Sequence, residues 1–313
     1  MGATGVQAVT GNRTGEPEVS IVMAVHNSAP TLAAAICSLL AQTFRNWELI
    51  VVDDASTDHF QAVMARFSDP RIRILSNPTR QGLAASLNRG VEGASAPSLA
   101  RMDADDICYP ARLERQLRLL QAQPSIDLLG TAIMMFRDDG TPLGIAPAPA
   151  GHEAICASGL AGSYNLYHPT WMGRTDWFRR HRYDPAFSKA QDFELLLRAA
   201  PTSRYANLPE ALVGYRVDPV IRLRKRLQTR VHVLKAVARN AATARVRMAL
   251  LRILGVTIGK AGLDVASSLG RGALGRRLLL RRPSASEADA WRDIWSSVQN
   301  AAARTRSQPA RDQ

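Results

Sequence analysis

The sequence predicts an α/β fold, in which a single, mostly parallel and twisted sheet is flanked by helices. Short β-branched runs alternate along the chain with longer segments of helical composition. This alternation is typical of a parallel sheet with helices on both faces. Polar residues follow the predicted strands at their carboxyl ends, which is where open α/β sheets bind ligands.

The predicted elements begin at residue 19. Strands are expected at 19–25, 48–52, 71–75, 98–102 and 127–136, and helices at 31–42, 60–67, 83–93 and 111–121. Asn27 or Ser28 can cap the first helix, and Pro30 suits its start. The Gly/Pro-rich segment 139–151 is expected to be a long loop that is functional or mobile.

The chain of 313 residues is long enough for one large α/β domain with an appendage. We expect a disordered N-terminus at 1–17, the α/β domain at 18–220, a basic helical extension at 221–282, and a short helix with a flexible tail at 283–313. The three cysteines lack disulfide or zinc spacing, and neither a signal peptide nor a membrane-spanning run is found. These features predict a cytoplasmic protein.

The net charge of +13 is concentrated in one segment. Residues 221–282 carry 16 basic residues and one acidic residue. Within this segment, Leu227, Val231, Leu234 and Val237 recur at helical spacing. The pattern predicts a basic amphipathic helix, which either binds an anionic membrane surface or packs on the α/β domain with a solvated basic face. No recognised nucleic-acid module is found, so nucleic acid is not an expected partner.

Three carboxylates, those of Asp103, Asp105 and Asp106, directly follow the strand expected at 98–102. Like charges this close must be solvated, paired or bound to a metal. On this stretch alone, two interpretations are equally good. One is an acidic turn that caps the next helix, and the other is a site for Mn²⁺ or Mg²⁺, which take oxygen ligands together with substrate phosphates.

Two more polar turns follow predicted strands, namely His26-Asn27 after the first and Asp53-Asp54 after the second. Because the carboxyl ends of parallel strands share one edge of a sheet, these turns and the acidic cluster should converge on one site. The convergence favours a metal site over a solvated turn. The chain has neither a GxGxxG nor a P-loop motif, which argues against a dinucleotide dehydrogenase and a P-loop nucleotidase.

Two residues in the second half could also carry chemistry. Phe193, Leu196 and Leu197 recur at helical spacing, which places Asp192 in the first turn of a helix. Taken alone, such a carboxylate is more often a helix-start residue than a catalytic group. His168, which precedes a proline, is likewise more often structural than a contact of donor phosphates or acceptor.

An ordered series of motifs spans about two thirds of the chain, from residue 19 to residue 216. They lie at 19–30, 38–44, 47–58, 88–90, 103–106, 168–170, 191–198 and 215–216. This series resembles the family 2 glycosyltransferases, which are nucleotide-sugar-dependent enzymes with the GT-A fold. The resemblance implies that fold, a nucleotide-diphosphate sugar as donor, and a divalent metal.

The resemblance also implies roles for individual residues. The positions that match nucleotide contacts are Ala24, Val25, His26, Asn27, Asp53 and Asp54. Asp103, Ala104 and Asp105 match the Asp-x-Asp motif, in which the two carboxylates hold the metal and, through it, the diphosphate; Asp106 adjoins them. Asp192 matches the catalytic base, which takes the proton of the attacking hydroxyl in a single inverting displacement.

The chain departs from the family pattern at two positions. His26 stands where a tyrosine is common, so stacking on the nucleobase differs. Gln191 replaces the acidic first member of a Glu-Asp pair, which removes a charge beside Asp192 and lowers its pKa relative to the family. The chain lacks the Gln-x-x-Arg-Trp motif and membrane spans of the processive members, so the resemblance implies one sugar added per acceptor.

These observations predict an inverting, metal-dependent, non-processive glycosyltransferase that uses a carbohydrate or lipid-linked saccharide acceptor. The resemblance implies a cytoplasmic enzyme, peripheral on the inner face of the cell membrane, in polysaccharide or glycolipid biosynthesis. The alternative is a non-catalytic assembly factor of the same fold that binds a nucleotide sugar or a membrane. The presence of Asp103, Asp105 and Asp192 favours the enzyme.

Overall fold

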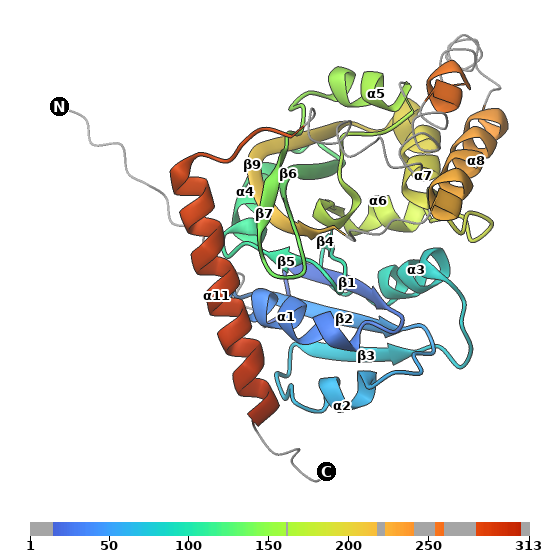
Figure 1. Cartoon of the computed structure of the whole chain (residues 1–313). Coiled ribbons are helices and arrows are strands. Elements are labelled where there is room, and N and C mark those ends of the chain that lie inside the picture. Colours follow the sequence, from blue (N-terminus) through green and yellow to red (C-terminus); the bar gives the residue numbers. More distant parts are fainter. Residues whose placement is uncertain (1–14, 161, 218–222, 241–253, 260–279, 308–313) are drawn as a thin grey trace.

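The structure is a computed structural model, shown in Figure 1. It describes residues 15–160, 162–217, 223–240, 254–259 and 280–307. The predictions for residues 1–14, for most of the basic extension and for residues 308–313 therefore lie outside the described residues.

The first half of the chain forms the parallel part of the sheet. Its strands are β1 (Val19–Val25), β2 (Trp47–Asp53), β3 (Ile72–Ser76) and β4 (Ser98–Arg101), in the order β3-β2-β1-β4. The helices between them are α1 (Ala29–Leu40), α2 (Phe60–Met64) and α3 (Leu83–Gly93). These elements agree with the predicted ones to within a few residues, and β1 and β2 in particular are β-branched runs followed by polar turns.

Alternation along β1 places apolar residues on both faces of the sheet. Ile21 and Met23 belong to a core that includes residues of α1, whereas Val22 belongs to the core on the α3 side. Gly90 allows α3 to approach the sheet, because a Cβ there would lie 2.3 Å from Cγ1 of Val22. The sheet is thus covered on both sides, as predicted.

The second half of the chain extends the same sheet with mixed pairing. Its elements are β5 (Ile107–Cys108), α4 (Arg112–Ala122), β6 (Leu128–Phe136), β7 (Pro142–Ala146), α5 (His152–Leu160), η1 (His168–Thr170), β8 (Met172–Arg174), α6 (Thr175–Arg180), α7 (Gln191–Ala199), η2 (Ala200–Thr202) and β9 (Tyr205–Arg216). The described strands form one nine-stranded sheet in the order β3-β2-β1-β4-β8-β6-β9-β5, with β7 beside β6. The predicted single sheet is confirmed, but it is mixed, because β8 lies antiparallel between β4 and β6.

The segment 139–151 is not a continuous loop, so this prediction needs correction. Residues Pro142–Ala146 form β7, which pairs antiparallel with β6. Ile145 of this strand is 1% exposed and pairs with Arg281, which precedes the last helix. Pro142 and Gly144 within this strand concealed it, although it forms a hairpin with the preceding strand β6.

Helix α8 (Leu223–Arg239) packs on α7 (Figure 1). The buried stripe of α8 consists of Val233, Ala236 and Val237, which contact a cluster around Phe187. Val231, which the sequence placed on the apolar face, is 63% exposed, so the predicted stripe is partly wrong. Packing on the domain is therefore observed for the described part of the basic extension, and membrane contact stays a prediction.

The last helix, α11 (Ala285–Ser307), has 23 residues and is longer than the short helix expected after Pro283. It starts at a capping box, in which Glu287 N donates to Ser284 Oγ at 3.2 Å and Ser284 N donates to Glu287 Oε2 at 2.8 Å. In Figure 1, α11 runs beside α1 along one side of the molecule. Among the described helices, none is both long and apolar enough to cross a membrane.

Candidate functional site

The turns after β1 and β2 are joined by hydrogen bonds. Asn27 N donates to Ser56 Oγ at 3.0 Å, and Thr57 N donates to Asn27 Oδ1 at 2.8 Å. His26 Nδ1 donates to the carbonyl oxygen of Asp54 at 2.8 Å. Asn27 and Ala55 both have a φ of 54°, a conformation that non-glycine residues seldom adopt. The two predicted nucleotide turns therefore form one built unit.

The carboxylates of Asp53 and Asp54 are used inside this unit. Asp54 is 3% exposed, and its two oxygens accept from Asn77 Nδ2, Gln81 N and Gly82 N at 2.8, 2.7 and 2.8 Å. Burial alone would raise the pKa of Asp54, but these donors hold it below its usual range. Asp53 Oδ1 accepts from Ser56 N at 3.0 Å. Both side chains order the turns, and their direct contact with a nucleotide stays a prediction.

Other residues predicted at the nucleotide site differ in their exposure. Val25 and Ala104 are 1% and 4% exposed, so mainly their backbones can reach a ligand. Ala24 and His26 are half-buried, and Asn27 is exposed. The exposed polar surface of this unit is therefore centred on the turn after β1.

The acidic cluster follows β4 directly, as predicted. One carboxylate oxygen from each of Asp103, Asp105 and Asp106 lies within 4.8 Å of the others. The Asp105 side chain is exposed at the surface. Nearby protein atoms nevertheless remove part of the water around its carboxylate, and this desolvation, together with the charge of Asp103, raises the pKa of Asp105 to about 6. Asp106 is 1% exposed, and its pKa is raised well above the usual range by burial and by Asp105. Each carboxylate therefore opposes the ionisation of its neighbours.

The donor set fits a divalent cation. Three carboxylates that raise one another's pKa are relieved by a hard cation, which prefers oxygen ligands. Asp106 Oδ2 is buried and has no hydrogen-bond partner among the described residues, which leaves a lone pair available. Asp103 and Asp105 would supply the more accessible metal ligands, and Asp106 would supply a third carboxylate on the buried side of the cluster.

Arg101 is a site residue that the sequence reasoning missed. It is 2% exposed and pairs through Nη2 with Asp103 Oδ1, while its Nε and Nη1 atoms have no partner in the described part of the chain. Burial alone would lower its pKa, but Asp103, Tyr183 and Asp106 keep it raised. A signal was present, because Arg101 is a basic residue only two positions before Asp103, which is close enough for the opposite charges to pair.

Arg216, the last residue of β9, fixes the cluster from another side. Its backbone N donates to Asp106 Oδ1 at 2.9 Å, and its Nε donates to the carbonyl oxygen of Asp105 at 2.8 Å. Its Nη1 pairs with Asp138 Oδ1 at 3.1 Å. The sequence marked Arg216 as a motif residue but could not assign it this contact, since it lies far from the cluster along the chain.

Asp192 lies in the first turn of α7, as predicted. Burial raises its pKa, whereas the charge of Arg101 lowers it and that of Asp103 raises it. These couplings link Asp192 to the acidic cluster through Arg101. Ala190, the residue before α7, has a φ of 54°, and Gln191 is 7% exposed. The chain therefore enters α7 through a strained residue that sets the direction of its first turn.

His168 is part of a buried aromatic cluster. It is 8% exposed, its Nε2 lies 2.8 Å from Tyr183 Oη, and its ring packs edge-on against Trp171 at 4.6 Å between centroids. Burial and the charge of Arg101 hold its pKa well below the usual range. A neutral, packed histidine supports the structural interpretation, and contact of His168 with substrate stays a prediction.

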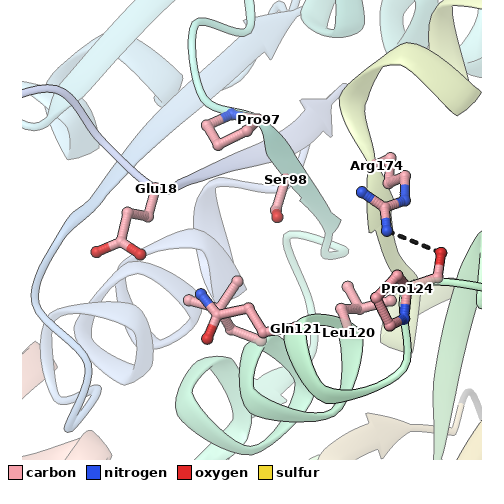
Figure 2. Close-up of a pocket in the computed structure, with 8 residues that line it drawn as sticks. Glu18, Pro97, Ser98, Leu120, Gln121, Pro124 and Arg174 are labelled. Atoms are coloured by element: carbon pink, nitrogen blue, oxygen red, sulfur yellow. Dashed lines mark hydrogen bonds between the residues drawn. The ribbon is translucent and has the colours of Figure 1, made fainter. Parts of the chain in front are cut away.

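A separate pocket of about 390 Å³ lies at the opposite edge of the sheet (Figure 2). Glu18 precedes β1 and Ser98 begins β4, so this pocket is at the amino ends of the strands. Arg174 at its rim donates from Nη2 to the carbonyl oxygen of Pro124 at 2.8 Å. The predicted site residues, all of which the structure describes, lie elsewhere.

Comparisons with known proteins agree with this architecture. The family model described as glycosyl transferase family 2 matches residues 20–180, about half of the chain. The putative glycosyltransferase EpsE of Bacillus subtilis is 36% identical over 211 residues, which cover 64% of this chain and 74% of that protein.

Solved structures share the fold. The crystal structure of S. aureus TarS 1–349 in complex with UDP has a TM-score of 0.59 at 18% identity, covering 90% of this chain and 91% of that chain. The mannosyltransferase PcManGT from Pyrobaculum calidifontis, in complex with GDP-Man and Mn²⁺, has a TM-score of 0.57 at 17% identity, covering 94% and 88%. The fold is therefore GT-A, and the family match shows that this chain is a glycosyltransferase of family 2.

Proposed function

We propose that the protein transfers a sugar from a nucleotide-diphosphate donor to an acceptor hydroxyl, with inversion, in a metal-dependent and non-processive reaction. The observation that carries this proposal is the arrangement around Arg101. Arg101 pairs with Asp103 of the acidic cluster, and its charge lowers the pKa of Asp192, which lies on a different element. One group of carboxylates can serve the leaving group while a separate carboxylate serves the nucleophile.

The donor would bind at the carboxyl ends of β1, β2 and β4. The joined turns after β1 and β2 offer the exposed amide of Asn27 and the half-buried ring of His26 to a nucleoside. The acidic cluster after β4 would hold the divalent metal, Mn²⁺ or Mg²⁺. When bound, such an ion neutralises the negative charge that develops on the departing diphosphate. Two neighbours of the same fold, one in complex with UDP and one in complex with GDP-Man and Mn²⁺, support this class of donor.

Asp192 would act as the base. A carboxylate whose pKa is raised by burial holds a proton more readily than an exposed one, which suits proton removal from a hydroxyl. The charge of Arg101 limits this rise. Arg101 thus has two roles in this proposal: it pairs with Asp103 and tunes Asp192.

The acceptor we propose is a carbohydrate hydroxyl, carried on a saccharide or on a lipid-linked saccharide used in polysaccharide or glycolipid biosynthesis. The basic segment 221–282, with 16 basic residues, supports attraction to an anionic membrane surface on the cytoplasmic side. Flotation with vesicles that contain anionic lipid tests this part. Deletion of the segment should abolish flotation, and unchanged flotation would exclude it as the membrane contact.

A donor assay tests the proposed reaction. Purified protein with Mn²⁺ should release nucleoside diphosphate from one member of a panel of nucleotide sugars, and a matching acceptor should increase the rate. Asp105→Asn should lose this activity. Asp289→Asn, which changes an exposed carboxylate on α11, is the control and should keep it. The absence of release across the panel, with and without lipid acceptors, would favour the non-catalytic assembly factor instead.

A further inference from the structure

We propose that helix α11 is a positioning element of the site, in which Trp295 orients Arg216 and Arg216 holds the backbone of the acidic cluster. Helix α11 lies outside the residues matched by the family model, 20–180. The functional importance of this link rests on the proposed function, because it takes the acidic cluster as the metal site. The link itself is structural and can be measured without any metal.

The first contact is between Arg216 and the cluster. Arg216 lies 111 positions after Asp105 and donates from Nε to its carbonyl oxygen at 2.8 Å. The backbone N of Arg216 donates to Asp106 Oδ1 at 2.9 Å. One residue therefore binds a backbone atom and a side-chain atom of two consecutive cluster residues, so a shift of Arg216 must change their relative position.

The second contact is between Arg216 and aromatic rings. Its guanidinium carbon lies 4.9 Å from the ring centroid of Phe136 and 5.7 Å from that of Trp295. Nη1 pairs with Asp138, and the side chain is 11% exposed. A guanidinium is attracted to aromatic faces, and its planar fork donates in fixed directions. Trp295, together with Phe136, therefore restricts the plane in which Arg216 can donate to the cluster.

The third contact holds α11 in place at this point. Trp291, one turn before Trp295, is fully buried and donates from Nε1 to the carbonyl oxygen of Gly140 at 2.7 Å. Gly140 has a φ of +85°, and a Cβ there would lie 2.2 Å from Nε1 of Trp295. These contacts of Trp291 and Trp295 with the turn at Gly140 fix the position of helix α11 relative to that turn.

The same region connects to the turn after β1. Arg216, Trp295 and Arg306 line a groove of about 230 Å³ together with Pro30 and Thr31 at the start of α1. Helix α11 thus borders both the support of the acidic cluster and the helix that follows the predicted nucleotide turn. This placement explains how a change on α11 can reach the site without contacting a substrate.

Hydrogen exchange followed by mass spectrometry or NMR tests the link. The reporters are the amides of Asp106 and Arg216, which donate to Asp103 O and Asp106 Oδ1. Trp295→Ala should speed their exchange by about tenfold, a change within the range of a partly buried cation–aromatic contact. Trp295→Phe keeps an aromatic ring and should restore most of the protection. Val298→Ala is the matched control, because Val298 is buried on α11 but does not line the groove that holds Arg216.

Calorimetry with Mn²⁺ tests whether the positioning of the acidic cluster by α11 affects its affinity for the metal. Trp295→Ala should weaken Mn²⁺ binding by about tenfold, because residues that orient metal ligands contribute to metal affinity. Val298→Ala should leave Mn²⁺ binding unchanged. Equal hydrogen-exchange rates for the Asp106 and Arg216 amides in Trp295→Ala and Val298→Ala would overturn the inference, whatever the Mn²⁺ affinities are. The expected exchange pattern in a protein that binds no Mn²⁺ would support the positioning link and contradict the proposed metal role.

Discussion

The guanidinium of Arg101 pairs with the carboxylate of Asp103 at the carboxyl end of β4, and the two side chains are 3% and 28% exposed. The pair thus has a buried cationic side and an anionic side that reaches solvent. The buried side also acts on Asp192, whose pKa the Arg101 charge lowers. One arginine therefore couples the predicted metal ligands to the predicted base.

Replacing Arg101 by methionine should shift the pH dependence of transfer. Arg101 lowers the pKa of Asp192, so its removal raises that pKa. The base is then protonated at higher pH, and the acid limb of the kcat profile moves to higher pH. Arg101→Lys should keep most of the charge effect. Arg115→Met, at an exposed ion pair with Glu210, is the control, and an unmoved acid limb in Arg101→Met would contradict the coupling.

Asp192→Asn should leave donor binding intact and reduce transfer by about 10² to 10⁴, the usual contribution of a general base. In the wild type, burial raises the pKa of Asp192, so kcat should fall as the pH drops through a value above 3.8. The asparagine variant should lose this acid limb. Asp176→Asn changes an 81% exposed carboxylate in the first turn of α6 and serves as the control. Normal turnover in Asp192→Asn would remove it from the role of base.

Glu48→Gln should reduce stability at neutral pH by about 2 kcal/mol, because a buried charged acceptor loses its ionic hydrogen bonds. Glu48 Oε1 accepts from Ser20 Oγ and Ser95 N at 2.6 and 2.8 Å, and Oε2 pairs with Arg73. Burial alone would raise the pKa of Glu48, but these partners lower it, so its stabilisation is present above pH 4.5 and is lost as the pH falls through the lower folded value.

Urea unfolding of Glu48→Gln between pH 3 and pH 7 measures this effect. The variant should show a smaller loss of stability than the wild type as the pH is lowered. Glu92→Gln is the control, because Glu92 makes an ion pair with Arg182 in which both side chains are more than half exposed, at 59% and 56%. Parallel stability curves for Glu48→Gln and the wild type would contradict the assignment.

Ala190→Gly should stabilise the fold by about 1 kcal/mol. Ala190 has a φ of 54°, where a Cβ is unfavourable and glycine is not. Ala303→Gly, in the exposed face of helix α11, should instead destabilise by a similar amount, because glycine weakens a helix. Thermal unfolding of both variants gives the comparison. Destabilisation by Ala190→Gly would mean that the left-handed conformation is not a source of strain.

Local pattern made much of the fold predictable from the sequence. The strands around Ile21 and Ile50 are β-branched runs whose alternate residues face opposite sides of the sheet, and the polar turns that follow them are encoded within a few residues. The acidic cluster and the helical position of Asp192 are local features of the same kind. Such features require no knowledge of distant contacts.

The remaining features depend on residues far apart in the chain. Strand β7 contains Pro142 and Gly144, and its Ile145 pairs with Arg281, far along the chain. Helix α11 is held to the sheet by Trp291, whose ring centroid lies 4.7 Å from that of Phe136. The support that Arg216 gives to the cluster joins two halves of the sheet. Propensity and spacing do not encode such contacts, so the sequence indicated the carboxylates of the site but not the arginines that hold them.

Binding of a nucleoside diphosphate reports on the proposed metal and donor site without requiring an acceptor. UDP and GDP are each titrated by calorimetry into the wild type and into Asp103→Asn/Asp105→Asn, with Mn²⁺ and with a chelator. We expect that one of the two nucleotides binds the wild type with Mn²⁺, and that the chelator or the double substitution weakens this binding by at least about tenfold. Equal affinity with and without Mn²⁺, or in the double variant, would contradict the assignment of the Asp103 and Asp105 carboxylates to a metal that holds the donor diphosphate.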